Sequence, residues 1–206
     1  MARPRSAEGS KRALAEAAAA LFADRGFHAT KVSDIVAAAG LTQAAFYLYY
    51  PSKDALYQEL IDGYFADVRR VLADGALPPG LDHPSLVAAM EATVLASFQV
   101  ALAYPDLTRM VMASDLAEPL LREAARSMAG HVRSAQAAGY VRPGLSAELW
   151  AECLNGAMVR LLHRYLLSGE RSPEELAAEA VRTLAYGSLG QPPEPSKEPP
   201  PKETPA

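Results

Sequence analysis

The chain of 206 residues is half hydrophobic and carries a net charge of −4, which is typical of a soluble globular protein with one sizeable domain or two small ones. Charges, prolines or glycines interrupt its longest apolar stretches, and no apolar segment follows the N-terminus, so we expect neither a membrane span nor a signal peptide. The lone Cys153 cannot form an internal disulfide, which favours a reducing, cytoplasmic compartment. We interpret Cys153 as a small hydrophobe, with a redox switch as the alternative.

Residues 1–10 are polar and contain Pro and Gly, which predicts a flexible basic arm. Arg3 and Arg5 either enter a DNA minor groove or belong to a merely solvated terminus, and the sequence favours neither. Although the whole chain is acidic, its first twelve residues carry four cations and one carboxylate. The basic end therefore coincides with the segment that we interpret as DNA-binding.

Residues 11–56 predict a three-helix unit. Its first helix runs from about Ser10 to Asp24, with apolar residues at helical spacing, and ends at Gly26. Phe27 is expected to close the core of this unit.

Within this unit, residues 30–53 predict two short helices joined by a tight turn and followed by the start of a third. Thr30 is expected to cap the first short helix, which ends at Gly40. Thr42 is expected to cap the second, residues 43–50, which is too short to persist without its neighbours. Helix, glycine-containing turn and helix is the arrangement that places a recognition helix in the major groove. The alternative is an ordinary helical hairpin in a bundle.

The second short helix separates inward-facing from outward-facing side chains. Phe46 and Tyr50 are expected to face the core. Gln43 lies at the N-terminal end, where its amide can pair with an adenine edge, and small neighbours allow contact with a thymine methyl. The residues expected to face bases are Gln43, Ala44, Ala45 and Leu48. The residues expected to contact phosphates are Thr30, Thr42, Tyr47, Tyr49 and Lys53.

The stretch GFHATKVSDIVAAAGLTQAAFYLYYPSKDALYQELI resembles the DNA-binding domain of the TetR (tetracycline-repressor-like) family of bacterial transcription regulators. The matching order includes Gly26, Thr30, Ala39-Gly40-Leu41-Thr42, Tyr47 and Ser52-Lys53. The resemblance implies the same base and phosphate contacts, a dimer that binds a palindromic operator, and usually repression. Gln43 stands where many relatives have a cation, and Ala44 where a glycine is frequent, so the operator sequence is not implied.

The remaining sequence, residues 57–189, predicts further helices and no strands, giving an all-α protein of about nine helices. A long helix from about Ser52 to Leu72 is followed by the non-helical segment 74–84, and helices then continue from Ser85. The final residues, 190–206, are proline-rich and charged, which predicts a disordered tail.

The last two helices, residues 146–167 and 173–189, have wide apolar faces that predict a dimer contact, and the family resemblance implies the same pair. Small residues there allow two helices to approach closely. The alternative is that both helices complete the core of a single protomer. The residues expected at the dimer interface are Cys153, Ala157, Leu161, Tyr165, Leu176, Ala180 and Leu184.

The helices of residues 57–189 are rich in methionine and aromatic side chains, which suit an adaptable pocket. For any one of these residues taken alone, ordinary core packing is the favoured role. Together with the resemblance they predict a site for a small hydrophobic effector. The residues expected to line it are Phe65, Met90, Thr93, Val94, Phe98, Met110, Met128, Trp150, Asn155 and Met158.

Two other classes of function remain as alternatives. An enzyme is disfavoured because the sequence has no phosphate-binding loop, nucleophile elbow, metal-ligand spacing or cofactor motif. We therefore expect no catalytic residue, no metal and no cofactor. A DNA-binding regulator or architectural protein controlled by a protein partner, without a metabolite, has no feature that separates it from the effector-controlled case.

Overall fold

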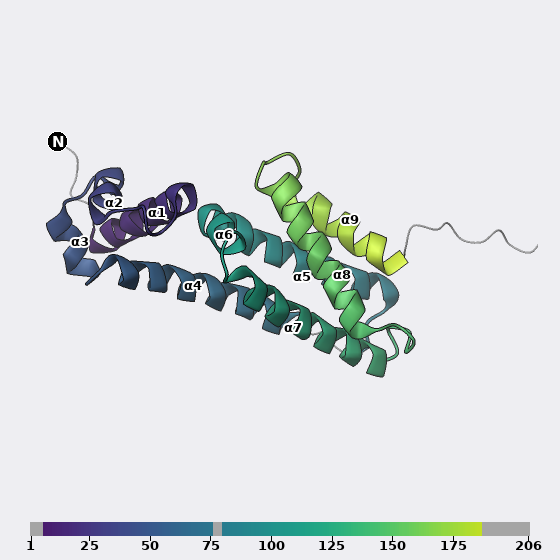
Figure 1. Ribbon diagram of the computed structural model, residues 1–206. Helices are drawn as coiled ribbons and strands as arrows, with labels where there is room; N and C mark the ends of the chain where they lie inside the picture. The colour runs from purple at the N-terminus through teal and green to yellow at the C-terminus, as the bar shows by residue number, and fades with distance from the viewer. Residues whose placement is uncertain (1–5, 76–79, 187–206) are drawn as a thin grey trace, which may run out of the picture.

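The computed structural model describes residues 6–75 and 80–186, which form nine α-helices, one short π-helical segment and no strand. The predicted all-α fold class is thus confirmed. Arg3, Arg5 and the proline-rich residues 190–206 lie outside the described residues. The molecule is elongated, with three N-terminal helices at one end and a helical bundle at the other (Figure 1).

The N-terminal unit packs three helices around one small core: α1 (Ala7–Arg25), α2 (Val32–Ala39) and α3 (Gln43–Tyr49). Helix α1 begins earlier than the sequence analysis expects, because the side chain of Ser6 caps it by accepting a hydrogen bond from the Gly9 amide at 3.1 Å. The most deeply buried side chains of this core are Leu14, Ala18, Phe22, Ile35, Phe46 and Leu56.

Helix α2 ends at Gly40, whose φ of 66° lies in the left-handed region that favours glycine. The Leu41 amide then donates to the Val36 carbonyl oxygen at 2.8 Å and closes the turn. Thr42 caps α3 as predicted, since its hydroxyl accepts a hydrogen bond from the Ala45 amide at 3.2 Å. The turn between α2 and α3 is therefore fixed by local hydrogen bonds on both sides.

Helix α4 (Lys53–Asp74) runs from the N-terminal unit into the C-terminal bundle (Figure 1). Ser52 caps it by accepting from the Ala55 amide at 3.1 Å. Leu56 belongs to the N-terminal core, whereas Ile61 and Tyr64 pack in a second apolar cluster with residues of α6 and α7. Helix α4 thus spans both ends of the molecule, which also meet where α1 packs on α6.

The C-terminal bundle contains the remaining helices. Helix α5 packs on α9 and on α4, and α7 packs along α8. The largest apolar cluster joins α5, α8 and α9. The elements of the bundle are α5 (His83–Ala103), α6 (Pro105–Met112), α7 (Ala117–Ala137), α8 (Ala147–Leu161), the π-helical segment Leu162–Leu166, and α9 (Pro173–Tyr186).

Helix α5 is the one helix among the described residues whose length and composition would suffice to cross a membrane. In this structure it packs against α4, α6 and α9, and its inward side chains line a cavity.

Candidate nucleic-acid interface and ligand cavity

One side of helix α3 is largely exposed to solvent. Tyr47 is 58% exposed and Leu48 is 81% exposed, and both rank among the most exposed large apolar side chains of the described residues. Gln43 and Ala44 are exposed on the first turn, while Ala45 and Tyr49 are partly buried. A seven-residue helix that presents such side chains to water is built for contact with another molecule rather than for the protein's own core.

The inner side of α3 holds the helix in place. Phe46 is fully buried and Tyr50 is 2% exposed, and their rings pack 5.7 Å apart between centroids. The Tyr50 hydroxyl donates to the Glu59 carboxylate of α4 at 3.2 Å. Burial, followed by the negative charge of Glu59, raises the pKa of Tyr50, so this hydroxyl stays protonated and keeps its hydrogen bond. Helix α3 is therefore braced against α4 while its outer side stays free.

Most cations of the N-terminal unit are already paired. Lys11 lies 2.9 Å from Glu59, and Arg25 lies 3.3 Å from Asp24 and 3.9 Å from Asp34. The Lys31 side chain, at the start of α2, is exposed and makes no ion pair within the described residues. The sequence analysis did not single out Lys31, because its position beside α3 depends on how the helices fold together. Bulk positive charge is small here, so recognition of a nucleic acid by this unit would depend on individually placed contacts.

Two of the predicted phosphate contacts have roles inside the protein. Thr30 is 1% exposed and does not cap α2; its hydroxyl lies 2.9 Å from the Gly26 carbonyl oxygen and 3.2 Å from that of Leu21. The Lys53 ammonium donates to the carbonyl oxygens of Phe27 and Thr30. The prediction for Thr30 is wrong because burial removes the hydroxyl from any ligand. Two of the three ammonium protons of Lys53 are occupied, which leaves one for a phosphate.

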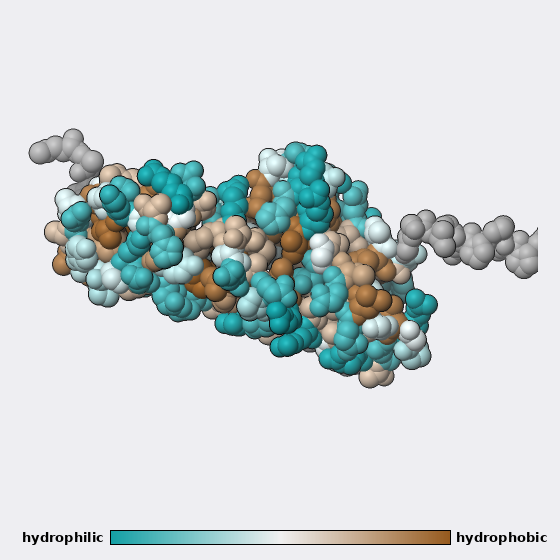
Figure 2. Space-filling model, viewed as in Figure 1, coloured by the Kyte–Doolittle hydropathy of each residue, from teal (hydrophilic) through white to brown (hydrophobic). Residues whose placement is uncertain are grey.

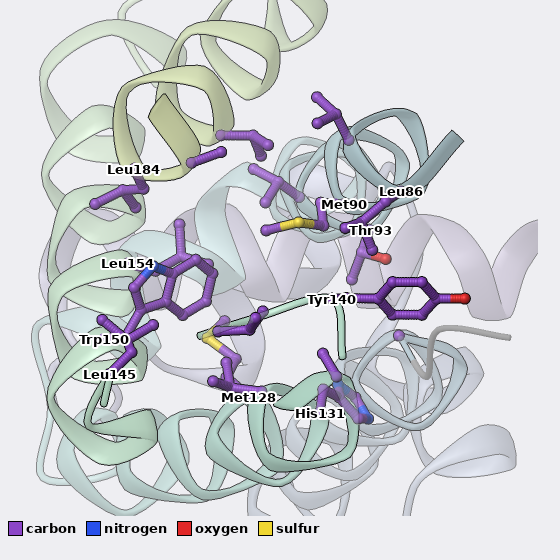
Figure 3. Close-up of a pocket in the computed structure, with 18 of the residues that line it drawn as sticks. Leu86, Met90, Thr93, Met128, His131, Tyr140, Leu145, Trp150, Leu154 and Leu184 are labelled. Atoms are coloured by element: carbon purple, nitrogen blue, oxygen red, sulfur yellow. The ribbon is translucent and has the colours of Figure 1, made fainter. Parts of the chain in front are cut away.

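A cavity of about 470 Å³ lies in the bundle, between α5 and α7 and closed by α8 and α9 (Figure 3). Leu86, Met90 and Thr93 face it from α5, and Met128 and His131 face it from α7. On the α8 side the wall is formed by the side chains of Leu145, Trp150 and Leu154, with Leu184 from α9 above them. The volume and the apolar lining are typical of a site for a small organic molecule.

The structure gathers six of the ten predicted lining residues around this cavity: Met90, Thr93, Val94, Met128, Trp150 and Met158. Four others lie elsewhere and are corrected. Phe98 is 2% exposed and fills the core between α5 and α8. Phe65 and Met110 pack in the cluster nearer the N-terminal unit. Asn155 is buried with its amide donating to the Leu121 carbonyl oxygen at 2.9 Å, which joins α8 to α7.

The sequence analysis missed part of the lining, including Leu86, Val132, Tyr140, Leu145 and Leu154. Tyr140 and Leu145 belong to the connection between α7 and α8, where no helical periodicity marks which side chains turn inward. The Tyr140 hydroxyl accepts a hydrogen bond from the Leu81 amide at 2.6 Å. This hydrogen bond joins the segment just before α5 to the connection between α7 and α8.

The outer side of α8 carries a stripe of residues at helical spacing: Leu149, Cys153, Gly156 and Arg160. All four are exposed, and Leu149 is 65% exposed. Apolar and polar residues alternate on the face where α8 and α9 lie (Figure 2). The interpretation of Cys153 as a buried hydrophobe is wrong, since its side chain belongs to this exposed stripe.

The predicted interface residues divide into three groups. Cys153 is exposed, and Ala157, Leu161, Tyr165 and Leu184 are partly buried, with Leu184 lining the cavity. Leu176 and Ala180 are both buried within the protomer, Leu176 in the apolar cluster that joins α9 to α5, so neither is available to a partner. The apolar side of α9 is used within the chain because α5 offers it a large apolar surface.

The residues that the structure describes contain no group of three or more His, Cys, Asp or Glu side chains placed to hold a metal ion. Their charged side chains instead form surface pairs between helices, such as Arg69 with Glu123 and Arg182 with Glu91.

Comparisons with known proteins agree with this arrangement. Residues 10–60 match the family model of bacterial regulatory proteins, tetR family. The chain is 36% identical over 181 residues to the HTH-type transcriptional regulator YdgC of Bacillus subtilis, covering 87% of this chain and 93% of that one. It is 31% identical over 111 residues to the transcriptional repressor KstR2 of Rhodococcus jostii, covering 52% of this chain and 54% of that one. Its fold is similar to that of a TetR-like transcriptional regulator from Rhodococcus sp. RHA1, with a TM-score of 0.65, 22% identity, and coverage of 89% and 97%.

Proposed function

The chain belongs to the TetR family of DNA-binding transcriptional regulators, and from this premise we propose that it is a cytoplasmic repressor. In this proposal it binds a palindromic operator as a homodimer, and a small hydrophobic effector releases it. The observation that carries the proposal is the exposed side of α3, which is braced from behind and offers Gln43, Ala44, Tyr47 and Leu48 to a major groove.

The DNA contacts proposed for α3 differ in kind. Gln43 lies at the N-terminal end, where a side chain reaches base edges, and its amide suits adenine. Ala44, Ala45 and Leu48 supply small or apolar contacts to bases. Tyr47, Tyr49, Thr42 and the remaining proton of Lys53 are assigned to phosphates, and the exposed Lys31 is added to them.

The outer stripe of α8 supports a homodimer. A glycine inside a helix costs about 1 kcal/mol relative to alanine. Gly156 makes no close contact within the protomer, because a Cβ built there meets nothing within 4 Å. A second helix that approaches closely at this point explains a glycine there. One short recognition helix reads only a few base pairs, so a two-fold pair is also what operator binding needs.

The cavity supports control by a ligand because its wall is attached to α4. The Ser127 hydroxyl of α7 donates to the Leu72 carbonyl oxygen of α4 at 3.2 Å, and Arg69 of α4 pairs with Glu123 of α7 at 2.8 Å. A ligand that favours a different separation of α5 and α7 therefore also favours a different position of α4. Differential affinity for two such conformers typically changes operator affinity about 5- to 150-fold.

The direct test is selection of bound fragments from a random duplex library with the full chain. The proposal expects a palindrome whose half-sites are centred about one helical turn apart. Failure to enrich any sequence at low salt would refute DNA recognition. Thermal denaturation with a broad panel of small molecules tests the effector, since a ligand of the folded state raises the melting temperature with concentration. If the selection enriches an operator but no compound of the panel raises the melting temperature, control by a protein partner is favoured.

A further inference from the structure

The lining of the cavity is nearly free of charged side chains. It contains no Asp, Glu or Lys among the described residues, and its one permanently charged side chain, Arg142, is exposed. Transferring an ionised ligand from water into such a wall is costly unless an opposite charge meets it inside. The lining therefore favours an uncharged ligand.

The hydroxyl groups of the α5 wall have already committed their protons. The Thr93 hydroxyl donates to the Ala89 carbonyl oxygen at 3.1 Å, and the Ser97 hydroxyl donates to the Thr93 carbonyl oxygen at 3.0 Å. Each oxygen keeps lone pairs that accept a hydrogen bond. These two hydroxyls can therefore accept a hydrogen bond from a ligand but have no free O–H to donate.

The His131 side chain, unlike the hydroxyls of Thr93 and Ser97, has no hydrogen-bond partner among the residues that the structure describes, and unlike the exposed His83 it is partly shielded from solvent. It is partly buried on α7 and makes no hydrogen bond or ion pair with the described residues. Its ring rests against Gly75 at the end of α4: a Cβ built on Gly75 would lie 3.0 Å from Cε1 and 3.1 Å from Nδ1. The same Cβ would lie 3.1 Å from Thr93 Cγ2, so His131 and Thr93 both lie against Gly75 at the edge of the cavity (Figure 3). Glycine at position 75 thus makes room for the ring.

Burial lowers the pKa of His131, so its imidazole is neutral near pH 7. A neutral imidazole has one N–H donor and one nitrogen acceptor. An alcohol group has the complementary pair, because its oxygen accepts and its proton is donated. Met128, one turn before His131 on α7, and Trp150 of α8 offer an apolar surface for the rest of the molecule.

We propose that the cavity binds an uncharged, mainly hydrocarbon ligand bearing a hydroxyl group, and that His131 is the residue that selects it. This inference rests on the proposed effector function and narrows it to a ligand class. His131 also contacts the end of α4 through Gly75, so the residue that selects the ligand adjoins the helix that carries the DNA-binding unit.

The test compares 1-decanol with decanoate, which share a hydrocarbon chain and differ in the charge of the polar end. Binding to the full chain is measured by calorimetry near pH 7.5. We expect wild-type protein to bind decanol at least tenfold more tightly than decanoate. His131→Phe, which keeps a ring against Gly75, is expected to lower the affinity for decanol about 3- to 10-fold. His131→Gln retains a donor and an acceptor and is expected to restore most of the affinity.

Met128→Leu is the matched control, because it changes an apolar part of the same wall at nearly constant volume. It is expected to leave the preference for decanol over decanoate unchanged. Equal or tighter binding of decanoate, or unchanged decanol binding by His131→Phe, would overturn the ligand class while leaving the cavity as a binding site. Absence of binding by both probes and by the broad panel would instead reject the effector function itself.

Discussion

The Lys53 ammonium nitrogen lies 2.8 Å from the Thr30 carbonyl oxygen, so the first residue of α4 is hydrogen-bonded to the loop that leads into α2. The same nitrogen lies 2.6 Å from the Phe27 carbonyl oxygen and 4.2 Å from the centroid of the Phe27 ring. Both Lys53 and Thr30 are residues that the sequence assigned to phosphates. In the folded chain they join α4 to the loop between α1 and α2, and so fix the direction in which α3 is presented.

Removing the Lys53 hydrogen bonds is expected to lower the stability of the N-terminal unit as well as its affinity for DNA. Lys53→Ala leaves two carbonyl oxygens without their charged donor, which we expect to lower the free energy of unfolding by about 1–3 kcal/mol. Urea denaturation followed by circular dichroism measures the change. The control is Lys31→Ala, which removes an exposed cation and is expected to lower the salt slope of operator binding by about one at unchanged stability. Equal stability of wild type and Lys53→Ala would refute the structural role.

Substitutions on the outer side of α3 separate base contacts from phosphate contacts. Gln43→Ala is expected to cost about 1–3 kcal/mol of binding and to relax the preference at one position of each half-site. Tyr47→Phe is expected to weaken binding while the preferred sequence stays the same. The sequence preference of each variant is measured by selection from a random duplex library. An unchanged sequence preference for Gln43→Ala would remove this residue from the base contacts.

Filling the cavity is expected to uncouple the protein from its effector. Met90→Trp places a larger side chain in the space between α5 and α7, at a stability cost of about 1–3 kcal/mol. Operator affinity should stay within about threefold of wild type, while stabilisation by any cavity ligand is lost. Met90→Leu serves as the control of similar volume. A Met90→Trp variant that responds to ligand like the wild type would place the binding site elsewhere.

A charge on the outer stripe of α8 is expected to separate the subunits. Gly156→Asp fits the isolated protomer, because a Cβ at this position meets nothing within 4 Å. In a close helix pair across a two-fold axis, it would bury two unpaired carboxylates. Sedimentation equilibrium should then show monomers, and tight operator binding should be lost. Ala88→Asp, on an exposed position of α5, controls for an added surface charge. A dimer that persists in Gly156→Asp would contradict this interface.

The partly buried imidazole of His131 predicts that the protein loses stability as the solution becomes acidic. Burial lowers its pKa from the ordinary value of 6.5. As the pH falls through 6.5, the unfolded chain therefore gains a proton at this site that the folded chain still resists, and stability decreases. Between pH 7.5 and 5.5, wild type should lose more stability than His131→Phe, as measured by urea denaturation at both pH values. Identical losses in the two proteins would show that His131 is not desolvated.

The sequence predicted the elements of the N-terminal unit well because their signals are local. Gly40, Thr42 and Ser52 end or begin helices through bonds to residues at most five positions away. The inward faces of Phe46 and Tyr50 follow from helical periodicity in the same way. The start of α1 was missed because its cap, Ser6, lies in a segment whose composition resembles that of a mobile arm.

What the sequence determined by itself is the all-α fold, the helix-turn-helix and the side of α3 that faces outward, since helix periods and caps depend on neighbours along the chain. Only the tertiary structure decided that Thr30 and Lys53 donate hydrogen bonds to backbone carbonyls. It also decided that the apolar side of α9 packs on α5, and that Phe98 fills a core while His131 faces a cavity. An apolar helix face must be buried, but the sequence does not state against which partner. That choice is made by how whole helices pack, over separations at which no local pattern carries information.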